Sequence, residues 1–274
     1  MAYRTDLAIE FEKIEKHAQN SGFKVGEIEV VFHDLPEVND YSKPKGKYAT
    51  IKMGKVEFLT DFSDVENAII LTLKKMITAT DNFLIVGLGN DEIISDSIGP
   101  FTTKKIIATR HIEANFAKSI GLENLKSVAV ITPNVLGKTG IEASDFVKAL
   151  VKKIKPEAVI VIDALCANNV ENLFSVIQLS SSGISPGSGV KNARKELSQA
   201  TLGVPTIAIG VPTVIEAETV VEKYCNAKLE NCENMLFAPK ETDILSHKVS
   251  EICGKALNVF LQPEIDKEII LSLV

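Results

Sequence analysis

Two aspartates of this chain follow apolar runs that are typical of buried β-strands. Asp96 lies in the segment GLGNDEIISDSIGP (87–100), which follows FLIV (83–86), and Asp163 ends the run AVIVID (158–163). In an open α/β sheet the functional crevice lies beyond the C-terminal ends of the strands. Two carboxylates in one such crevice cannot easily both ionise, so they share a proton. Such a pair can activate a water while it protonates a leaving group.

The same residue types also fit other roles. An aspartate after an apolar strand often caps a helix or binds a metal ion or a ribose. Gly87 and Gly89 begin a dinucleotide-binding pattern, but Glu92 occupies the place of its third glycine, and Asp91 and Glu92 would repel a pyrophosphate. The chain contains neither a Walker phosphate-binding motif nor a GxSxG nucleophile elbow. We therefore expect no nucleotide cofactor and no serine nucleophile.

Cysteine and histidine offer weaker candidates. Cys166 lies three residues after Asp163, but no histidine is close in sequence, so we interpret it as a small buried residue. None of the four cysteines belongs to a CxxC pair, which argues against a structural zinc site and favours reduced thiols. His111 could line a site or lie in a helix, whereas we expect His17 and His247 on the surface.

The composition is that of an ordinary globular protein, because 45% of the 274 residues are hydrophobic and 24% are charged. The net charge of −6 argues against a surface that coats nucleic acid or an anionic membrane, and it is compatible with a basic substrate. The chain begins without an apolar signal segment, and no apolar run approaches the ~20 residues that span a bilayer. We expect a cytoplasmic protein that binds neither nucleic acid nor membrane directly.

The elements that position the two aspartates follow from the hydrophobic pattern. Five short runs are apolar on both faces, as in buried, mostly parallel strands: 83–86, 128–132, 158–163, 176–179 and 206–210. Two stretches have helical spacing, with apolar stripes at 143, 146, 147, 150 and 154 and at 245, 249, 252, 253, 256 and 260. We predict an α/β fold, a mostly parallel sheet covered by helices, in a single domain over residues 1–274.

Further elements are predicted outside this pattern. Residues 7–18 place Leu7 on the apolar face of a helix, and residues 26–60 form a strand-rich excursion at the edge of the sheet. The residues Ser63 to Glu66 form a capping box that opens another helix. The segment SSSGISPGSG (180–189) is expected to be a long loop within the domain.

Several motifs, taken in order, identify a family. Together these motifs resemble the germination protease of endospore-forming bacteria. In chain order they are YRTDLAIE, GLGN…SDSIGP, TPNVLGKTGIEASD, VIVIDAL, SGISPGSGV, TLGVPTIAIGVPTVIEA and PKETD. The resemblance runs from residue 3 to about residue 260. It implies an α/β fold related to the hydrogenase-maturation peptidases. It also implies an aspartic-type endopeptidase, made as a zymogen, that degrades small acid-soluble spore proteins during germination.

The resemblance also assigns roles to residues. The family's proposed catalytic pair corresponds to Asp96 and Asp163. We expect Gly87, Gly89 and Asn90 to form the tight turn that orients Asp96, with backbone amides that steady a developing oxyanion. No metal or organic cofactor is expected. Family substrates are cut after an acidic and before a large apolar residue, within a T-E-[FI]-A-S-E-F-type sequence. The family further implies a homotetramer located in the cytoplasm of the forespore or spore core.

The first residues of the chain resemble such a substrate. In TDLAIEF (5–11) an acidic residue precedes a large apolar one, Ala follows, and Glu-Phe closes the stretch. We expect self-processing between Asp6 and Leu7, which would remove a leader of residues 1–6. The alternative is that Asp6 lies in the first turn of the 7–18 helix, where a negative charge favours the helix dipole.

The chain departs from the family pattern at several positions. Ile94-Ser95 replaces the usual Thr-Pro before the first aspartate, while Ser181, Ser185 and Lys191 replace an Asp, a His and a Gly. The long helical segment that many members carry before PKE-x-D is reduced here to about 226–238. If the replaced histidine helps to bind substrate, this chain must bind it differently.

Other functions are compatible with the same residues. A metal-assisted peptidase of the hydrogenase-maturation type would use Asp96, Asp163 and His111 as ligands of nickel in its substrate. A non-catalytic spore protein would bind the same basic substrates in an acidic cleft without cutting them. A Rossmann-like binding module is a more distant alternative.

Overall fold

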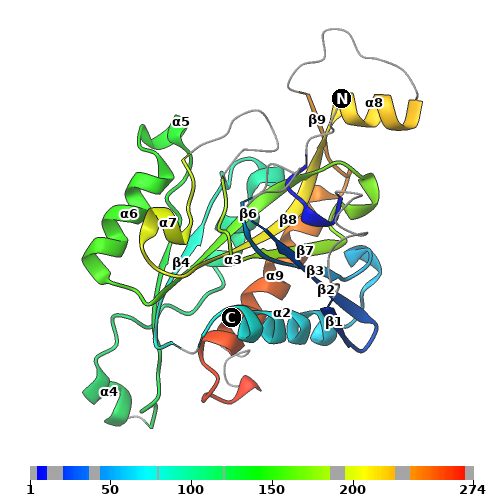
Figure 1. Cartoon of the computed structure of the whole chain (residues 1–274). Coiled ribbons are helices and arrows are strands. Elements are labelled where there is room, and N and C mark those ends of the chain that lie inside the picture. Colours follow the sequence, from blue (N-terminus) through cyan, green and yellow to red (C-terminus); the bar gives the residue numbers. More distant parts are fainter. Residues whose placement is uncertain are drawn as a thin grey trace.

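The computed structural model describes residues 5–10, 21–36, 44–78, 80–119, 121–185, 195–225 and 235–268. These residues build one mixed sheet with helices on both faces (Figure 1). The strand order is β1-β2-β3-β7-β8-β6-β4-β5, and β9 also pairs with β8. The strands are β1 (Ser21–Val25), β2 (Ile28–Leu35), β3 (Gly46–Lys52), β4 (Asn82–Gly87), β5 (Ser127–Ile131), β6 (Ala158–Ala167), β7 (Val176–Ser180), β8 (Thr206–Glu216) and β9 (Leu236–Phe237).

The half of the sheet that carries Asp163 is parallel. Strands β8, β6, β4 and β5 run in the same direction, and β6 lies between β8 and β4. Every residue of β6 except Ala164, and every residue of β8 except Glu216, is buried, which explains why their sequences are apolar on both faces. All five predicted strands are present, but β6 and β8 extend four and six residues beyond their predicted ends, and β5 is mostly half-buried rather than buried.

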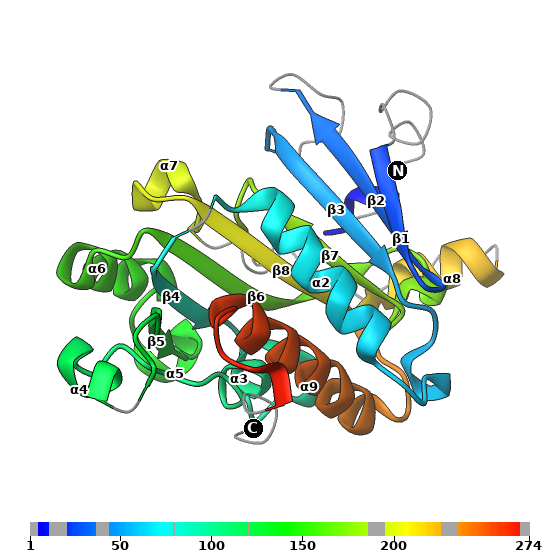
Figure 2. The ribbon, with the colours of Figure 1, turned by 90° about the horizontal axis from the view of Figure 1, so that it is seen from below.

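Helices cover both faces of this sheet. They are α2 (Ser63–Met76), α3 (Ile98–Thr103), α4 (Ala114–Ser119), α5 (Leu136–Thr139), α6 (Ala143–Ile154), α7 (Gln199–Leu202), α8 (Ala217–Cys225) and α9 (Thr242–Leu261). Figure 2 shows α2 and α9 lying across one face, where Phe83 and Ile85 of β4 point. The alternate residues Leu84 and Val86 pack on the other face with Val147 of α6. Four 3₁₀ turns complete the described elements: η1 (Ala8–Glu10), η2 (Val56–Phe58), η3 (Ile94–Asp96) and η4 (Val170–Asn172).

The other half of the sheet is antiparallel. Strands β1, β2 and β3 pair in sequence and join the sheet through β7, so the strand-rich excursion predicted over residues 26–60 lies at the sheet edge as expected. Because β7 also pairs antiparallel with β8, the sheet is mixed, and the parallel part is confined to four strands. The predicted α/β class with helices on the sheet faces is confirmed.

Some local predictions need correction. Ser63 is the first residue of α2 and Phe62 is its N-cap, without a side-chain cap bond, so the predicted capping box is wrong. Asp61 provides the side-chain contact instead, because its Oδ1 accepts from the Ser63 amide at 2.9 Å. In α6 the side chain of Phe146 is 43% exposed, so it lies outside the predicted apolar stripe.

The predicted 7–18 helix can be compared only at its start. Residues Ala8–Glu10 form the 3₁₀ turn η1, and residues 11–20 lie outside the described residues, as does His17. Leu7 is completely buried, as its place on the apolar face required. Within the described residues, no helix is both long and apolar enough to cross a membrane.

Candidate active site

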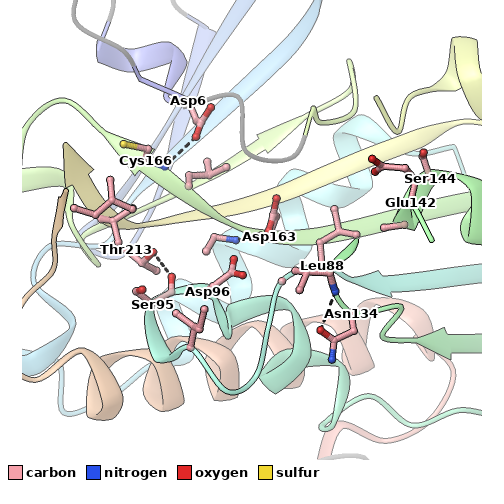
Figure 3. A pocket seen from close by; sticks show the side chains of 18 of the residues that line it. Asp6, Leu88, Ser95, Asp96, Asn134, Glu142, Ser144, Asp163, Cys166 and Thr213 are labelled. Atoms are coloured by element: carbon pink, nitrogen blue, oxygen red, sulfur yellow. Dashed lines mark hydrogen bonds between the residues drawn. The ribbon is translucent and has the colours of Figure 1, made fainter. Parts of the chain in front are cut away.

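A cavity of about 270 Å³ opens where β4 ends and along the C-terminal halves of β6 and β8. Asp96 and Asp163 both line it, and Figure 3 shows Asp163 on β6 and Asp96 on the neighbouring loop. Two more carboxylates line the cavity, those of Asp6 and Glu142. The basic group on its described wall is Lys195, which is paired with Asp145 outside the lining, at 3.0 Å. The cavity is therefore strongly acidic.

The turn after β4 fixes the position of Asp96. Gly89 has φ +107°, and a Cβ there would lie 2.0 Å from the carbonyl oxygen of Asp96, so only glycine fits without strain. The amide of Asn90 donates to that carbonyl oxygen and to Asp96 Oδ2, both at 3.0 Å. The turn thus holds both the backbone and the carboxylate of Asp96. Since the Asn90 amide is used in this way, the structure does not support the expectation that it steadies an oxyanion.

A second glycine brings the loop of Asp96 against the strand of Asp163. A Cβ at Gly99 would lie 2.2 Å from the carbonyl oxygen of Leu88 and 2.5 Å from that of Ile162. The Leu88 amide donates to the same Ile162 oxygen at 2.8 Å. The start of α3 therefore packs directly on the end of β4 and on the middle of β6. This close packing explains the glycine-rich sequence without any bound phosphate.

The strand β8 holds the same loop from the other side. Thr213 Oγ1 donates to the carbonyl oxygen of Ser95 at 2.6 Å (Figure 3). On β6, Asp163 is 5% exposed, and its Oδ1 accepts from the amide of Ala164 at 3.0 Å. Asp163 is thus positioned by its own strand, β6, and Asp96 by a short loop that is anchored to the neighbouring strands.

Cys166 lines the same cavity but is a poor nucleophile. It is 2% exposed, and its burial, together with the charges of Asp6 and Glu216, raises the pKa of its thiol to about 12. Because the thiolate is the reactive form, such a thiol is inert at neutral pH. The interpretation of Cys166 as a small buried residue is confirmed.

The N-terminal segment enters the site. The Asp6 amide donates to the Cys166 carbonyl oxygen, and the Cys166 amide donates to Asp6 Oδ2, both at 2.9 Å (Figure 3). Gln178 of β7 donates through Nε2 to the Asp6 carbonyl oxygen at 3.0 Å and accepts at Oε1 from the Ala8 amide at 2.6 Å. Leu7, between them, packs on Leu165 among buried apolar side chains.

The remaining predicted residues lie elsewhere. His111 is exposed and does not line the cavity, so the structure does not bring it to the two aspartates. The described residues contain no group of three or more His, Cys, Asp and Glu side chains placed to hold a metal ion. His247 is exposed, as expected, and stacks on Phe101 at 4.4 Å between ring centres. Ser181 Oγ accepts from the Lys47 amide at 2.9 Å, which ties the end of β7 to β3.

Sequence reasoning missed several residues around the segment Thr5–Glu10. Gln178 belongs to the predicted apolar strand 176–179, and a polar residue inside such a run is the signal that could have identified it. Asn168, Asn169 and Asn172, which surround the side chain of Glu10, were not singled out either. Their role depends on a contact between residues about 160 positions apart, which no local pattern indicates.

The sequence is similar to known proteins over most of its length. The family model described as germination protease matches residues 7–230. The germination proteases of Clostridium tetani and Clostridium acetobutylicum are 34% and 33% identical, covering 99% and 96% of this chain and the same shares of the relatives. That of a Geobacillus strain (WCH70) is 40% identical, covering 79% of this chain and 64% of the relative.

A solved structure is also similar. The [NiFe] hydrogenase maturation protease HycI from Thermococcus kodakarensis KOD1 aligns with a TM-score of 0.41 and 14% identity, covering 68% of this chain and 98% of its own. The family assignment depends on the sequence matches, which span nearly the whole chain. On those matches, the chain belongs to the germination protease family of peptidases.

Proposed function

We propose that this chain is an aspartic-type endopeptidase that degrades small acid-soluble spore proteins during germination, in the cytoplasm of the spore. It acts as a single α/β domain assembled into a homotetramer, and it cuts after an acidic and before a large apolar residue. The observation that carries the proposal is that Asp96 and Asp163 line one acidic cavity, which the substrate-like residue Asp6 also enters.

In the proposed reaction one carboxyl of the pair is protonated and the other is ionised. The ionised carboxylate takes a proton from water as the water oxygen bonds to the scissile carbonyl carbon, and the protonated carboxyl donates to the carbonyl oxygen. The C–N bond then breaks as one hydroxyl of the intermediate returns its proton to the second carboxylate, and the leaving nitrogen takes up the proton that the other carboxyl took from water. Water is added across the peptide bond without an acyl-enzyme. These steps require no metal or organic cofactor.

The glycine turn serves this reaction by orienting Asp96. Because the Asn90 amide bonds both the carbonyl oxygen and Oδ2 of Asp96, the carboxylate cannot rotate away from the cavity without losing a hydrogen bond. We assign this orienting role to Gly87, Gly89 and Asn90. Stabilisation of the oxyanion then falls to the protonated carboxyl of the pair and to donors that hold the substrate carbonyl.

The rim of the cavity supports the proposed preference for a large apolar residue. Ile93 and Leu236 line the cavity, and their side chains are 52% and 43% exposed. Burying such side chains under an apolar substrate residue would release about 25 cal/mol per Å² of covered apolar surface. A basic, DNA-coating substrate is in turn attracted by the acidic wall.

The same site supports the proposed self-processing between Asp6 and Leu7. The segment Thr5–Glu10 contacts the cavity wall, and the carbonyl of the bond to be cut is held by Gln178. The alternative role of Asp6, as a charge in the first turn of a helix, is weaker, because its carboxylate bonds Cys166 instead.

The test is incubation with a purified small acid-soluble spore protein, followed by mapping of the cut sites by mass spectrometry. We expect cuts after Asp or Glu and before a large apolar residue, and none with the Asp163→Asn variant. Activity that strong chelators abolish would favour the metal-assisted peptidase. Full binding of the spore protein without cleavage, before and after processing, would favour the non-catalytic binding protein.

A further inference from the structure

The side chain of Glu10 is held by four donors near the end of β6. Its Oε2 accepts from the Asn168 amide at 2.6 Å and from the hydroxyl of Thr5. Its Oε1 accepts from the Asn169 amide at 3.0 Å and from Asn172 Nδ2 at 2.7 Å. We call Asn168, Asn169 and Asn172 the carboxylate cradle. A group of donors that surrounds both oxygens of one side chain selects a carboxylate over an amide, because a carboxylate only accepts hydrogen bonds.

The cradle is built independently of Glu10. The Asn169 side chain caps η4 by accepting from the Glu171 amide at 3.0 Å, which fixes the turn that carries the donors. Lys223 Nζ donates to the carbonyl oxygen of Asn168 at 2.9 Å and brings a positive charge to the site. These contacts aim the two backbone amides outward and favour an anionic ligand.

The chain between Asp6 and Glu10 is held by contacts of two kinds. Gln178 bonds only backbone atoms, those of Asp6 and Ala8, so it is indifferent to the side chains there. The contacts that depend on the side chain are the carboxylate of Asp6 on the Cys166 amide, the burial of Leu7, and the carboxylate of Glu10 in the cradle. This wall of the protein therefore recognises an acid, an apolar residue, and a second acid four positions after the first.

We propose that the carboxylate cradle is the substrate subsite that binds the second acidic residue of the substrate, four positions after the acidic residue that precedes the cut, so that Asn168, Asn169 and Asn172 are specificity-determining residues. Glu10 occupies the subsite in the free chain, so a substrate must displace it. This inference rests on the proposed endopeptidase function, since it describes how that activity chooses its peptides. It adds a specificity determinant that lies beyond the catalytic cavity.

The test uses two synthetic peptides and the full chain carrying Glu10→Ala, which vacates the cradle. One peptide is YRTDLAIEFE, and the other has Gln in place of the Glu that corresponds to Glu10. We expect kcat/KM to be at least about 10-fold higher for the Glu peptide than for the Gln peptide. The difference should lie in KM, which should be lower for the Glu peptide, because unpaired donors in the cradle disfavour an uncharged ligand. Adding Asn172→Asp, which replaces a donor by a negative charge, should abolish this preference. Asn115→Asp, the same change on the exposed surface of α4, should preserve it.

The outcomes separate this inference from the proposed function. Equal cleavage of both peptides at the Asp-Leu bond would overturn the subsite and leave the endopeptidase standing. Failure to cut either peptide would contradict the endopeptidase, and the cradle would then be tested by binding alone. This binding test uses fluorescence anisotropy with labelled peptides and the double variant Glu10→Ala and Asp163→Asn. The double variant should bind the Glu peptide about 10-fold more tightly than the Gln peptide. Equal affinities would overturn the subsite there too.

Discussion

Asp163 of β6 and Gln178 of β7 are both paired with the same residue, Gly210 of β8. Directly paired residues point to the same face of a sheet, so the carboxylate and the amide share one face. The Cα atoms of the two residues are separated by two strand spacings, about 10 Å. The intervening glycine leaves room for the side chain of Leu165, because a Cβ there would lie 2.3 Å from Leu165 Cδ1 and the leucine would have to shift. One row across three strands thus joins the proposed catalytic acid to the residue that holds the Asp6 carbonyl.

Asp96→Asn and Asp163→Asn should each abolish cleavage and leave the fold intact. The changes are nearly isosteric, and a pair that shares a proton fails when either acid is lost. Circular dichroism should be unchanged, while kcat on a spore protein falls below detection. If either variant retains more than about a tenth of the wild-type kcat, a loss of only ~1.4 kcal/mol of transition-state stabilisation, the dyad mechanism is wrong.

Gln178→Leu should slow both self-processing and the cutting of added peptides. The substitution preserves size but removes the donor to the Asp6 carbonyl and the acceptor for the Ala8 amide. Leaving such groups unpaired costs about 1–3 kcal/mol, which corresponds to roughly 5- to 160-fold in rate. The control is Gln199→Leu on the exposed surface of α7. Unchanged rates in Gln178→Leu would show that the clamp is only a structural tether.

Gly89→Ala should damage the site far more than Gly137→Ala. An added methyl group at residue 89 would meet the Asp96 carbonyl oxygen at 2.0 Å in a left-handed backbone, whereas residue 137 has no atom within 4 Å of the added group. We expect Gly89→Ala to lose roughly 2–4 kcal/mol of unfolding free energy, together with activity. Urea unfolding measures the first quantity, and peptide cleavage the second. Equal stability of the two variants would contradict the tight turn.

The strands and the acids could be predicted, but their surroundings could not. Residues 83–86 and 158–163 are buried in parallel strands, so their continuous apolar sequence was a reliable signal. Asp96 could be picked out because it follows such a strand, and Asp163 because it is the first polar residue after the apolar run, although β6 continues beyond it to Ala167. The cradle and Gln178 could not, because their function depends on a partner far away in the sequence. The capping box failed because Asp61, two residues before the expected cap, bonds the first amide of α2.

Cys166 should be dispensable for cleavage. With a thiol pKa of about 12, only about one molecule in ten thousand carries the thiolate at pH 8, and the fraction rises only as the pH approaches that value. An alkylating reagent should therefore label the exposed Cys225 and leave activity unchanged. Cys166→Ala should also stay active. Stoichiometric inactivation that substrate prevents, with the label on Cys166, would make this thiol the nucleophile.

The wild-type chain should cut itself between Asp6 and Leu7 on incubation at pH ~5, in the range where carboxylates titrate. Asp6 lines the cavity with Asp96 and Asp163, so repulsion among these carboxylates opposes a closer approach, and acid weakens that repulsion. The Asp6 side chain must also leave its present contact, because its carboxylate bonds the Cys166 amide.

N-terminal sequencing of the incubated protein measures this step. A new terminus at Leu7 should form in the wild type and in the exposed-surface variant Glu27→Ala, and it should be absent in Asp163→Asn. The rate should be independent of protein concentration, because Thr5–Glu10 contacts the cavity wall of its own chain. A rate that rises in proportion to concentration would show that one molecule cuts another. An intact terminus in a preparation that still cuts spore proteins would refute self-processing at this bond.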